Sequence, residues 1–226
     1  LPAVKDYEQV DDDIIATLRP TKGWFILLMA AIACLAIGIS SWMWQIREGL
    51  GVAGYNPPVM WGVYIISFVF WVGIGHAGTL ISAILYLFRA GFRTTIYRAA
   101  EAMTVFAVMT AGLFPVLHLG RAWFAYWVFP YPNTRGLWAN FRSPLVWDVF
   151  AISTYFTVSA TFLLMGLIPD LAAVRDQAAG WRKKVYGLVS LGWKNSDREW
   201  QHFGRMYLFR AALATPLVLS VHSVVS

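Results

Sequence analysis

Long apolar runs separated by short polar connections dominate this chain. From Gly49 to Phe88 there are forty consecutive residues without Asp, Glu, Lys or Arg. A helix needs roughly 20 apolar residues to cross a hydrocarbon core of about 30 Å. This run is therefore long enough for one membrane crossing and an outer loop. Similar runs on either side of it predict a chain that crosses the membrane several times.

The pattern predicts five membrane helices, over residues 24–46, 59–88, 99–119, 143–168 and 203–226. Ser143 and Pro144 favour a helix start, because serine caps free N–H groups and proline fits the first helical position. Pro115 is expected to bend the end of the third helix. The predicted fold class is all-α, a polytopic transmembrane helix bundle in which helices two to five form a four-helix bundle.

The predicted organisation follows from these helices. It consists of a cytoplasmic N-terminal segment (1–22), a first transmembrane helix (23–47) and a four-helix bundle (56–226), the last with an aromatic outer loop (120–143) and a basic cytoplasmic segment (171–202). The final apolar run, 211–226, makes only about 24 Å of helix. Because this is too short to leave the membrane, we expect the native polypeptide to continue beyond it.

Lys and Arg are concentrated in alternate connections. Fourteen of the 18 precede the first predicted helix, separate the second from the third, or lie between Arg175 and Arg210. Cytoplasmic loops carry the excess of Lys and Arg. The N-terminus is therefore predicted to be cytoplasmic, and the aromatic loop to face outward.

Composition supports the membrane class and excludes several others. The chain is 58% hydrophobic and 13% charged. Its net charge of +6 is spread between apolar runs, which does not indicate a nucleic-acid partner. Cys34 is the single cysteine. It cannot form an internal disulfide or hold an iron–sulfur cluster, so any such cluster would belong to a partner.

His76 lies near the middle of the second predicted helix, among Gly73, Gly75 and Gly78. A titratable group at membrane depth is costly and marks a candidate functional site. The glycines allow a helix or a ligand to approach closely, and Thr79 adds polarity to this face. The alternative is an imidazole that only hydrogen-bonds a neighbouring helix.

Asp148 lies about one turn into the fourth predicted helix, on the outer side. It could accept a proton with a route to the outer aqueous phase. Alternatively, it caps its own helix or pairs with Arg121 or Arg142. His118 and Arg121 end the third helix one turn apart, where the arginine could hold Asp148, steady an anionic ligand or snorkel. His222, on the fifth helix, is expected in the outer half too.

These polar groups all fall in the predicted outer half, and nothing comparable is expected in the inner half. The outer loop is rich in Trp, Tyr and Phe, which form an interfacial belt or also wall a flat apolar ligand. The basic segment mixes cations with Trp181, Tyr186 and Trp193, and could lie as an amphipathic segment on anionic lipid.

This setting suits quinol oxidation, which removes two electrons and two protons. The protons need bases that titrate near neutral pH, and histidine is the natural one. A carboxylate hydrogen-bonded to it would orient the ring. We therefore predict His76 and Asp148 as catalytic residues. The predicted quinone-binding residues are Gly75, Thr79, His118, Arg121 and His222, and no metal site is predicted.

Four motifs are similar to those of the NrfD/PsrC family of membrane quinone subunits. They are Gly73-Ile74-Gly75-His76-Ala77-Gly78-Thr79, Arg98-Ala99-Ala100-Glu101-Ala102-Met103-Thr104, Phe129-Pro130-Tyr131-Pro132-Asn133 and Ser143-Pro144-Leu145-Val146-Trp147-Asp148-Val149-Phe150. Within that family, they most closely resemble the ActC subunit of bacterial alternative complex III. The resemblance covers roughly residues 56–226.

The resemblance implies a haem-free subunit of the bacterial cytoplasmic (inner) membrane with two four-helix bundles, of which residues 56–226 would form the first. It implies oxidation of quinol, commonly menaquinol, near the periplasmic face, with His76 and Asp148 at the site. Electrons would pass to a periplasmic iron–sulfur subunit and then to multihaem cytochrome c subunits. A paralogous NrfD-like membrane subunit shares the fold without an evident quinone site, and the His76 and Asp148 pair favours the quinol-oxidising copy.

Two other functions stay open from the residues. One is a haem b anchor, which needs two axial ligands, often histidines at one depth. His76 and His118 are expected at different depths, which fits this poorly. The other is a proton-conducting or scaffold subunit without its own quinone site. The expected lack of an inner acid or base weakens a complete proton relay within these residues, although further helices or neighbouring subunits could complete one.

Overall fold

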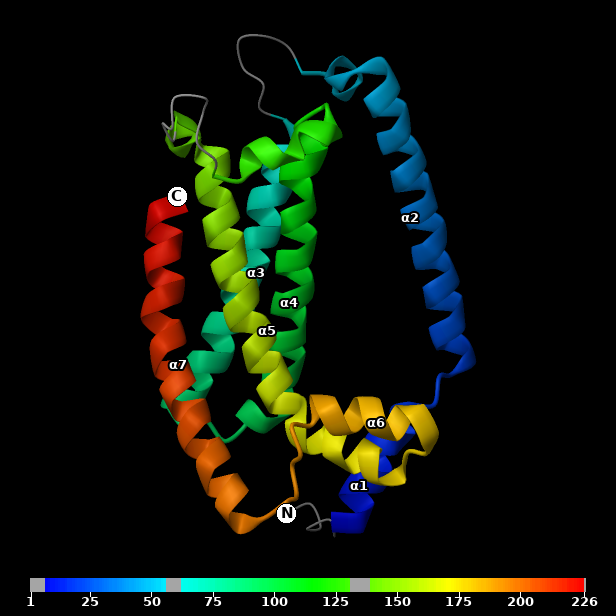
Figure 1. The fold of residues 1–226 in the computed structure, drawn as a ribbon, viewed down its shortest axis with the longest axis vertical. Coiled ribbons are helices and arrows are strands. Elements are labelled where there is room, and N and C mark those ends of the chain that lie inside the picture. Colours follow the sequence, from blue (N-terminus) through cyan, green and yellow to red (C-terminus); the bar gives the residue numbers. More distant parts are fainter. Residues whose placement is uncertain (1–6, 56–61, 131–138, 226) are drawn as a thin grey trace. The chain divides into compact units, whose positions relative to one another are not determined.

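The computed structural model describes residues 7–55, 62–130 and 139–225, and these ranges contain helices and no strand (Figure 1). The prediction of an all-α fold is confirmed. The α-helices are α1 (Tyr7–Ala16), α2 (Lys22–Glu48), α3 (Val63–Leu87), α4 (Arg93–His118), α5 (Pro144–Gln177), α6 (Gly180–Val189) and α7 (Asp197–Val225). Short 3₁₀ helices cover Leu50–Ala53, Ala122–Val128 and Ala139–Arg142.

Four helices in the described ranges are long and apolar enough to cross a membrane: α2, α3, Ile96–His118 within α4, and α5. They correspond to the first four predicted spans. The fifth predicted span falls in α7, which does not meet the same criterion over its described residues. Its first half carries several charged residues, among them Asp197, Arg205 and Arg210. Helix α5 runs nine residues past the predicted end at 168, because Pro169 lies inside the helix without ending it.

The chain divides into two compact units that do not follow sequence order. One consists of Leu1–Ile37 and Leu164–Met206, and the other of Gly38–Leu163 and Tyr207–Ser226. We call them the first and second units. The second unit contains His76, Asp148 and the other predicted site residues.

Helices α3 and α4 approach each other closely at Gly78. A Cβ atom at this position would lie 2.1 Å from Thr104 Oγ1 and 2.6 Å from the backbone oxygen of Ala100. At Gly75 it would lie 2.9 Å from Val108 Cγ2, whereas Gly73 has nothing within 4 Å. Gly75 and Gly78 therefore permit the close helix packing expected from the sequence, and Gly73 does not take part in it.

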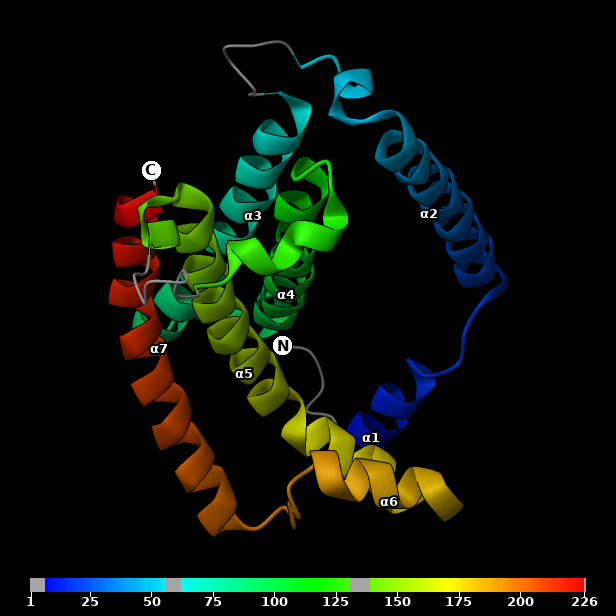
Figure 2. The ribbon, with the colours of Figure 1, turned by 45° about the horizontal axis from the view of Figure 1, so that its top comes forward.

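Hydrogen bonds join the helices of the second unit. Thr79 on α3 pairs with Ser159 on α5 at 3.2 Å. Tyr155 on α5 donates to the backbone oxygen of Val218 on α7 at 2.8 Å. The parts of α3, α4, α5 and α7 in this unit lie side by side in both views (Figures 1 and 2). Val108, Tyr155 and Val218 form a buried apolar cluster at their centre.

The end of α2 that belongs to the second unit is fastened by one buried polar residue. The side-chain amide of Gln45 donates to the backbone oxygen of Leu117 at 3.2 Å, and the Tyr64 hydroxyl donates to Gln45 Oε1. Most other residues of α2 are exposed, including its large apolar side chains. Such a surface suits contact with lipid, where an apolar side chain needs no protein partner.

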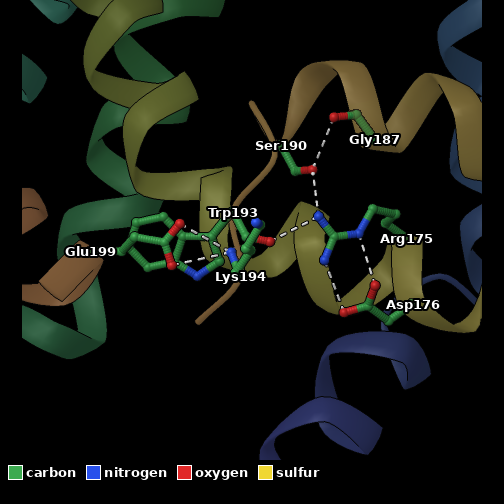
Figure 3. A network of polar contacts seen from close by, with 7 residues as sticks. All are labelled: Arg175, Asp176, Gly187, Ser190, Trp193, Lys194 and Glu199. Atoms are coloured by element: carbon green, nitrogen blue, oxygen red, sulfur yellow. Dashed lines mark hydrogen bonds and ion pairs between the residues drawn. The ribbon is translucent and has the colours of Figure 1, made fainter. Parts of the chain in front are cut away.

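A polar network organises the first unit at the end of α5 (Figure 3). Arg175 donates to both carboxylate oxygens of Asp176, at 2.8 and 3.0 Å. The same guanidinium donates to the backbone oxygen of Trp193 at 2.8 Å and to Ser190 Oγ at 3.4 Å. Trp193 is 9% exposed and packs with Ile168 and Ala172 in an apolar cluster.

This network corrects part of the predicted amphipathic segment. The sequence analysis groups Trp193 with the aromatic residues of a segment that could lie on lipid. In the structure the Trp193 side chain is buried, and Arg175 donates a hydrogen bond to its backbone oxygen. Helix α6 keeps an exposed apolar side, with Trp181 71% and Leu188 77% exposed. At the start of α7, backbone N–H groups of Ser196 and Lys194 donate to Glu199, which holds the pKa of this carboxyl below its usual value.

Candidate functional site

A pocket in the second unit brings His76 and Asp148 together. The space between its lining residues amounts to about 350 Å³ when the open solvent at its mouth is included. Helices α3, α4 and α5 supply its walls. The lining residues are Phe68, Val72 and His76 from α3, Val108 and Ala111 from α4, and Asp148, Ala151, Ile152 and Tyr155 from α5. The two residues predicted as catalytic therefore face one small, mostly apolar space.

Asp148 is half-buried near the start of α5. It makes no hydrogen bond or ion pair with any residue that the structure describes. Arg121 and Arg142, the predicted alternative partners, do not line the pocket, and Arg121 is exposed. The carboxyl group therefore remains available to a ligand in the pocket.

His76 packs against Tyr155, which the sequence analysis missed. The ring centroids lie 4.3 Å apart at an interplanar angle of 64°. The hydrogen bond from the Tyr155 hydroxyl to the Val218 oxygen fixes the tyrosine ring, which in turn limits the orientation of the imidazole. Tyr155 lies seven residues after Asp148, and Ile152 lies four after it. This spacing places all three on one face of α5 and would have identified the tyrosine.

Substitutions at Tyr155 should separate the roles of its ring and its hydroxyl. Tyr155→Phe removes one hydrogen bond and should lower the free energy of unfolding by about 1 kcal/mol. Tyr155→Ala also empties part of the buried cluster, which should cost about 3–5 kcal/mol. Chemical unfolding of the purified protein in detergent checks both values. If both variants lost the same free energy of unfolding, the Tyr155 ring would not contribute to packing at the pocket wall.

The other predicted site residues whose side chains the structure describes do not line the pocket. Gly75 packs against Val108, a lining residue, and Thr79 is engaged with Ser159 one turn further along α3. His118 stacks edge-on against Tyr55, with ring centroids 5.8 Å apart. The side chain of His222 lies outside the described residues.

Glu101 is a buried acid near the start of α4, in the part of the helices that the sequence analysis assigns to the inner half and where it expects no comparable group. It lies in the third turn of α4, near the end of the unit where α3 ends and α4 begins, which we call the α3–α4 end. Its side chain is 3% exposed. Ser82 Oγ donates to Glu101 Oε1 at 2.7 Å, and the Tyr207 hydroxyl donates to the same oxygen. In the sequence, Glu101 lies near the start of the predicted helix 99–119, where a charged side chain is usually solvated.

Comparison with known proteins identifies the family. The family model described as "Polysulphide reductase, NrfD" matches residues 51–221. The chain belongs to the NrfD family. Together with its apolar helices, this membership makes it an integral, multi-pass membrane protein.

Two relatives of this NrfD-family chain are parts of reductases by name. The present chain is 27% identical over 222 residues to a putative dimethyl sulfoxide reductase membrane subunit of Halobacterium salinarum. The aligned region covers 95% of this chain and 46% of the relative. It is also 22% identical over 161 residues to a selenate reductase subunit of Mesobacillus selenatarsenatis. This region covers 70% of the present chain and 35% of the relative. The chain thus spans less than half the length of either relative.

Proposed function

We propose that the pocket binds quinol and that this chain is the quinol-oxidising membrane subunit of a multi-subunit oxidoreductase. The observation that carries the proposal is the meeting of His76 and Asp148 in one apolar pocket. A quinol ring is flat and apolar except for its two hydroxyl groups. Side chains such as Phe68, Val72 and Ile152 suit the ring, while the imidazole and the carboxylate suit the hydroxyls.

The chemistry needs two proton acceptors and an electron acceptor. As the quinol loses two electrons, its hydroxyl protons pass to bases within hydrogen-bond reach, and His76 and Asp148 fill this role. Tyr155 holds the imidazole in place during the transfer. The electrons leave the chain for an iron–sulfur subunit docked on the outer side, since the sequence has a single cysteine.

The names of the relatives support this assignment of direction. Both are named as subunits of reductases, and one of them as a membrane subunit. A reductase consumes electrons, and a membrane subunit beside lipid-soluble quinol is placed to supply them. We extend this role to the present chain, with menaquinol as the proposed donor.

The assembly around the subunit is proposed from the motif resemblance. In an alternative complex III, the partners would include multihaem cytochrome c subunits and a paralogous NrfD-like membrane subunit. In a reductase of the kind named for the relatives, a catalytic reductase subunit would take their place. The visible absorption of haem c in the purified complex distinguishes these two assemblies.

The proposed topology has five crossings of the bacterial inner membrane, with α7 as the fifth and the N-terminus in the cytoplasm. Helices α3, α4, α5 and α7 would form the first four-helix bundle. This orientation places Asp148 toward the periplasm. The alternative of a haem b anchor is disfavoured, because His118 stacks on Tyr55 while His76 lies in the pocket.

Titration of the purified complex with a fluorescent quinol-analogue inhibitor tests the proposal. His76→Ala and Asp148→Asn should each weaken binding by about tenfold or more, since the first removes a hydrogen bond to a buried ligand group and the second removes the charge that strengthens one. The exposed His202 provides a matched control, because His202→Ala removes an imidazole that does not line the pocket. Undiminished binding in both pocket variants would remove the site assignment.

A further inference from the structure

Glu101 is the most deeply buried carboxylate in the described part of the second unit, and its surroundings are unusual for an ionised group. Both groups that donate to it, Ser82 and Tyr207, are hydroxyls. Its second oxygen, Oε2, is buried and has no hydrogen-bond partner among the described residues. A buried carboxylate is costly unless it is paired with a cation and fully hydrogen-bonded. These surroundings therefore suit a group that changes its protonation state.

The nearest cations lie at the α3–α4 end. The Arg93 guanidinium lies over the rings of Tyr86, Tyr97 and Tyr207, with distances of 4.3, 4.5 and 5.0 Å to the ring centroids. Arg98 donates to the Tyr97 hydroxyl at 2.9 Å. The burial of Glu101 opposes its ionised form, while the charges of the two arginines favour that form more weakly.

Buried hydroxyl groups lie along α3 between the pocket and Glu101. His76, Thr79 and Ser82 follow one another at intervals of three residues, over about 9 Å of helix. Thr79 and Ser159 pair midway, and both side chains are buried. Ser82 then donates to Glu101. Each step is about one helical turn, a gap that a hydroxyl rotation or one bridging water closes.

We infer that Glu101 is a proton-carrying site that exchanges a proton with His76 through Ser82 and the Thr79–Ser159 pair. The inference rests on the proposed function, because quinol oxidation is what delivers a proton to His76. No electron moves in this step. One proton leaves the imidazole, each hydroxyl accepts one proton and passes on its own, and the Glu101 carboxylate receives one. The reverse order reloads His76 from the α3–α4 end.

The arrangement accounts for polar groups that packing alone does not require. Thr79, Ser82, Thr104 and Ser159 are all buried within apolar helices. Thr104 is satisfied by the backbone of its own helix, at 3.0 Å from the Ala100 oxygen. The other three instead face one another or Glu101 across helix boundaries. They lie between two titratable groups, with hydrogen bonds within the Thr79–Ser159 pair and from Ser82 to Glu101.

The test compares Glu101→Gln with the native complex in two measurements. Glutamine keeps the size and hydrogen bonds of the side chain but cannot carry the proton. In infrared difference spectra between the oxidised and reduced complex, the native protein should show a carboxyl C=O signal that Glu101→Gln lacks. Quinol-driven electron transfer should fall roughly tenfold or more. Affinity for the quinol analogue should stay within about twofold, since Glu101 does not line the pocket.

The outcomes separate this inference from the proposed function. Failure of the native complex to bind the analogue would contradict the quinol site itself. A Glu101→Gln complex that keeps both the infrared signal and the native rate would reduce Glu101 to a packing role. If the Glu101→Gln complex does not assemble, Ser82→Ala provides a second test. It leaves Glu101 in place and removes the hydroxyl group that donates to it. It should shift the carboxyl signal and slow transfer, and an unchanged signal and rate would overturn the inference.

Discussion

An Asp148→Asn variant of the intact complex should oxidise quinol at least about 10²-fold more slowly than the native complex. Asparagine preserves the shape of the side chain and removes only its ability to accept a proton. Since Asp148 has no ion-pair partner among the described residues, the substitution leaves no unpaired cation behind. The fold should therefore remain intact, and steady-state oxidation of quinol with the native partner subunits measures the loss.

Asp176→Asn provides the matched control for this experiment. Asp176 lies on the same helix, with its side chain 64% exposed and paired with Arg175. Exposed pairs contribute little to stability, so this variant should keep a rate within about twofold of native. Equal rates in the two variants would show that Asp148 takes no part in the proton transfer.

Gly78→Ala should destabilise the second unit more than a methyl group added at Gly73 or Gly75. The added Cβ would lie 2.6 Å from the backbone oxygen of Ala100, and a backbone atom cannot rotate away as a side chain does. Helices α3 and α4 would have to separate. Overpacking of this kind costs about 1–3 kcal/mol, and separation would also displace His76. The midpoint of thermal unfolding in detergent should fall accordingly.

The two neighbouring glycines make a graded control. Gly73→Ala meets nothing within 4 Å and gains helix propensity, so its stability should equal or slightly exceed native. Gly75→Ala meets Cγ2 of Val108, a side-chain atom and not a backbone atom, at 2.9 Å and should fall between the two. The same loss at Gly73 and Gly78 would show that the close approach of α3 and α4 does not limit stability.

Sequence reasoning identifies the helices and the two central residues for clear physical reasons. Apolar runs of membrane length are visible without any knowledge of packing, and α3 (Val63–Leu87) lies within the predicted range 59–88. His76 and Asp148 stand out because a titratable residue in such a run is conspicuous. Their meeting in one pocket depends on how the helices are rotated, and the structure supplies that information.

The residues that the sequence does not reveal depend on contacts between distant parts of the chain. Glu101 is buried by Tyr207, 106 residues later, and no local pattern reveals this pair. Trp193 is a residue type typical of a membrane surface, yet its side chain is buried and its backbone oxygen accepts a hydrogen bond from Arg175, 18 residues earlier. Tyr155 differs from these, because its spacing from Asp148 is visible in the sequence.

The bond from Tyr155 to Val218 makes α7 sensitive to the occupancy of the pocket. Among the described side chains of α7, none lines the pocket, but the backbone of this helix accepts the hydrogen bond from the tyrosine whose ring touches His76. A ligand that moves the imidazole must therefore strain or relax this bond. Conversely, a protein that docks on α7 and shifts it would alter ligand affinity by the same free energy, because such coupling is reciprocal. Assembly with partner subunits would thus tune the pocket from a distance.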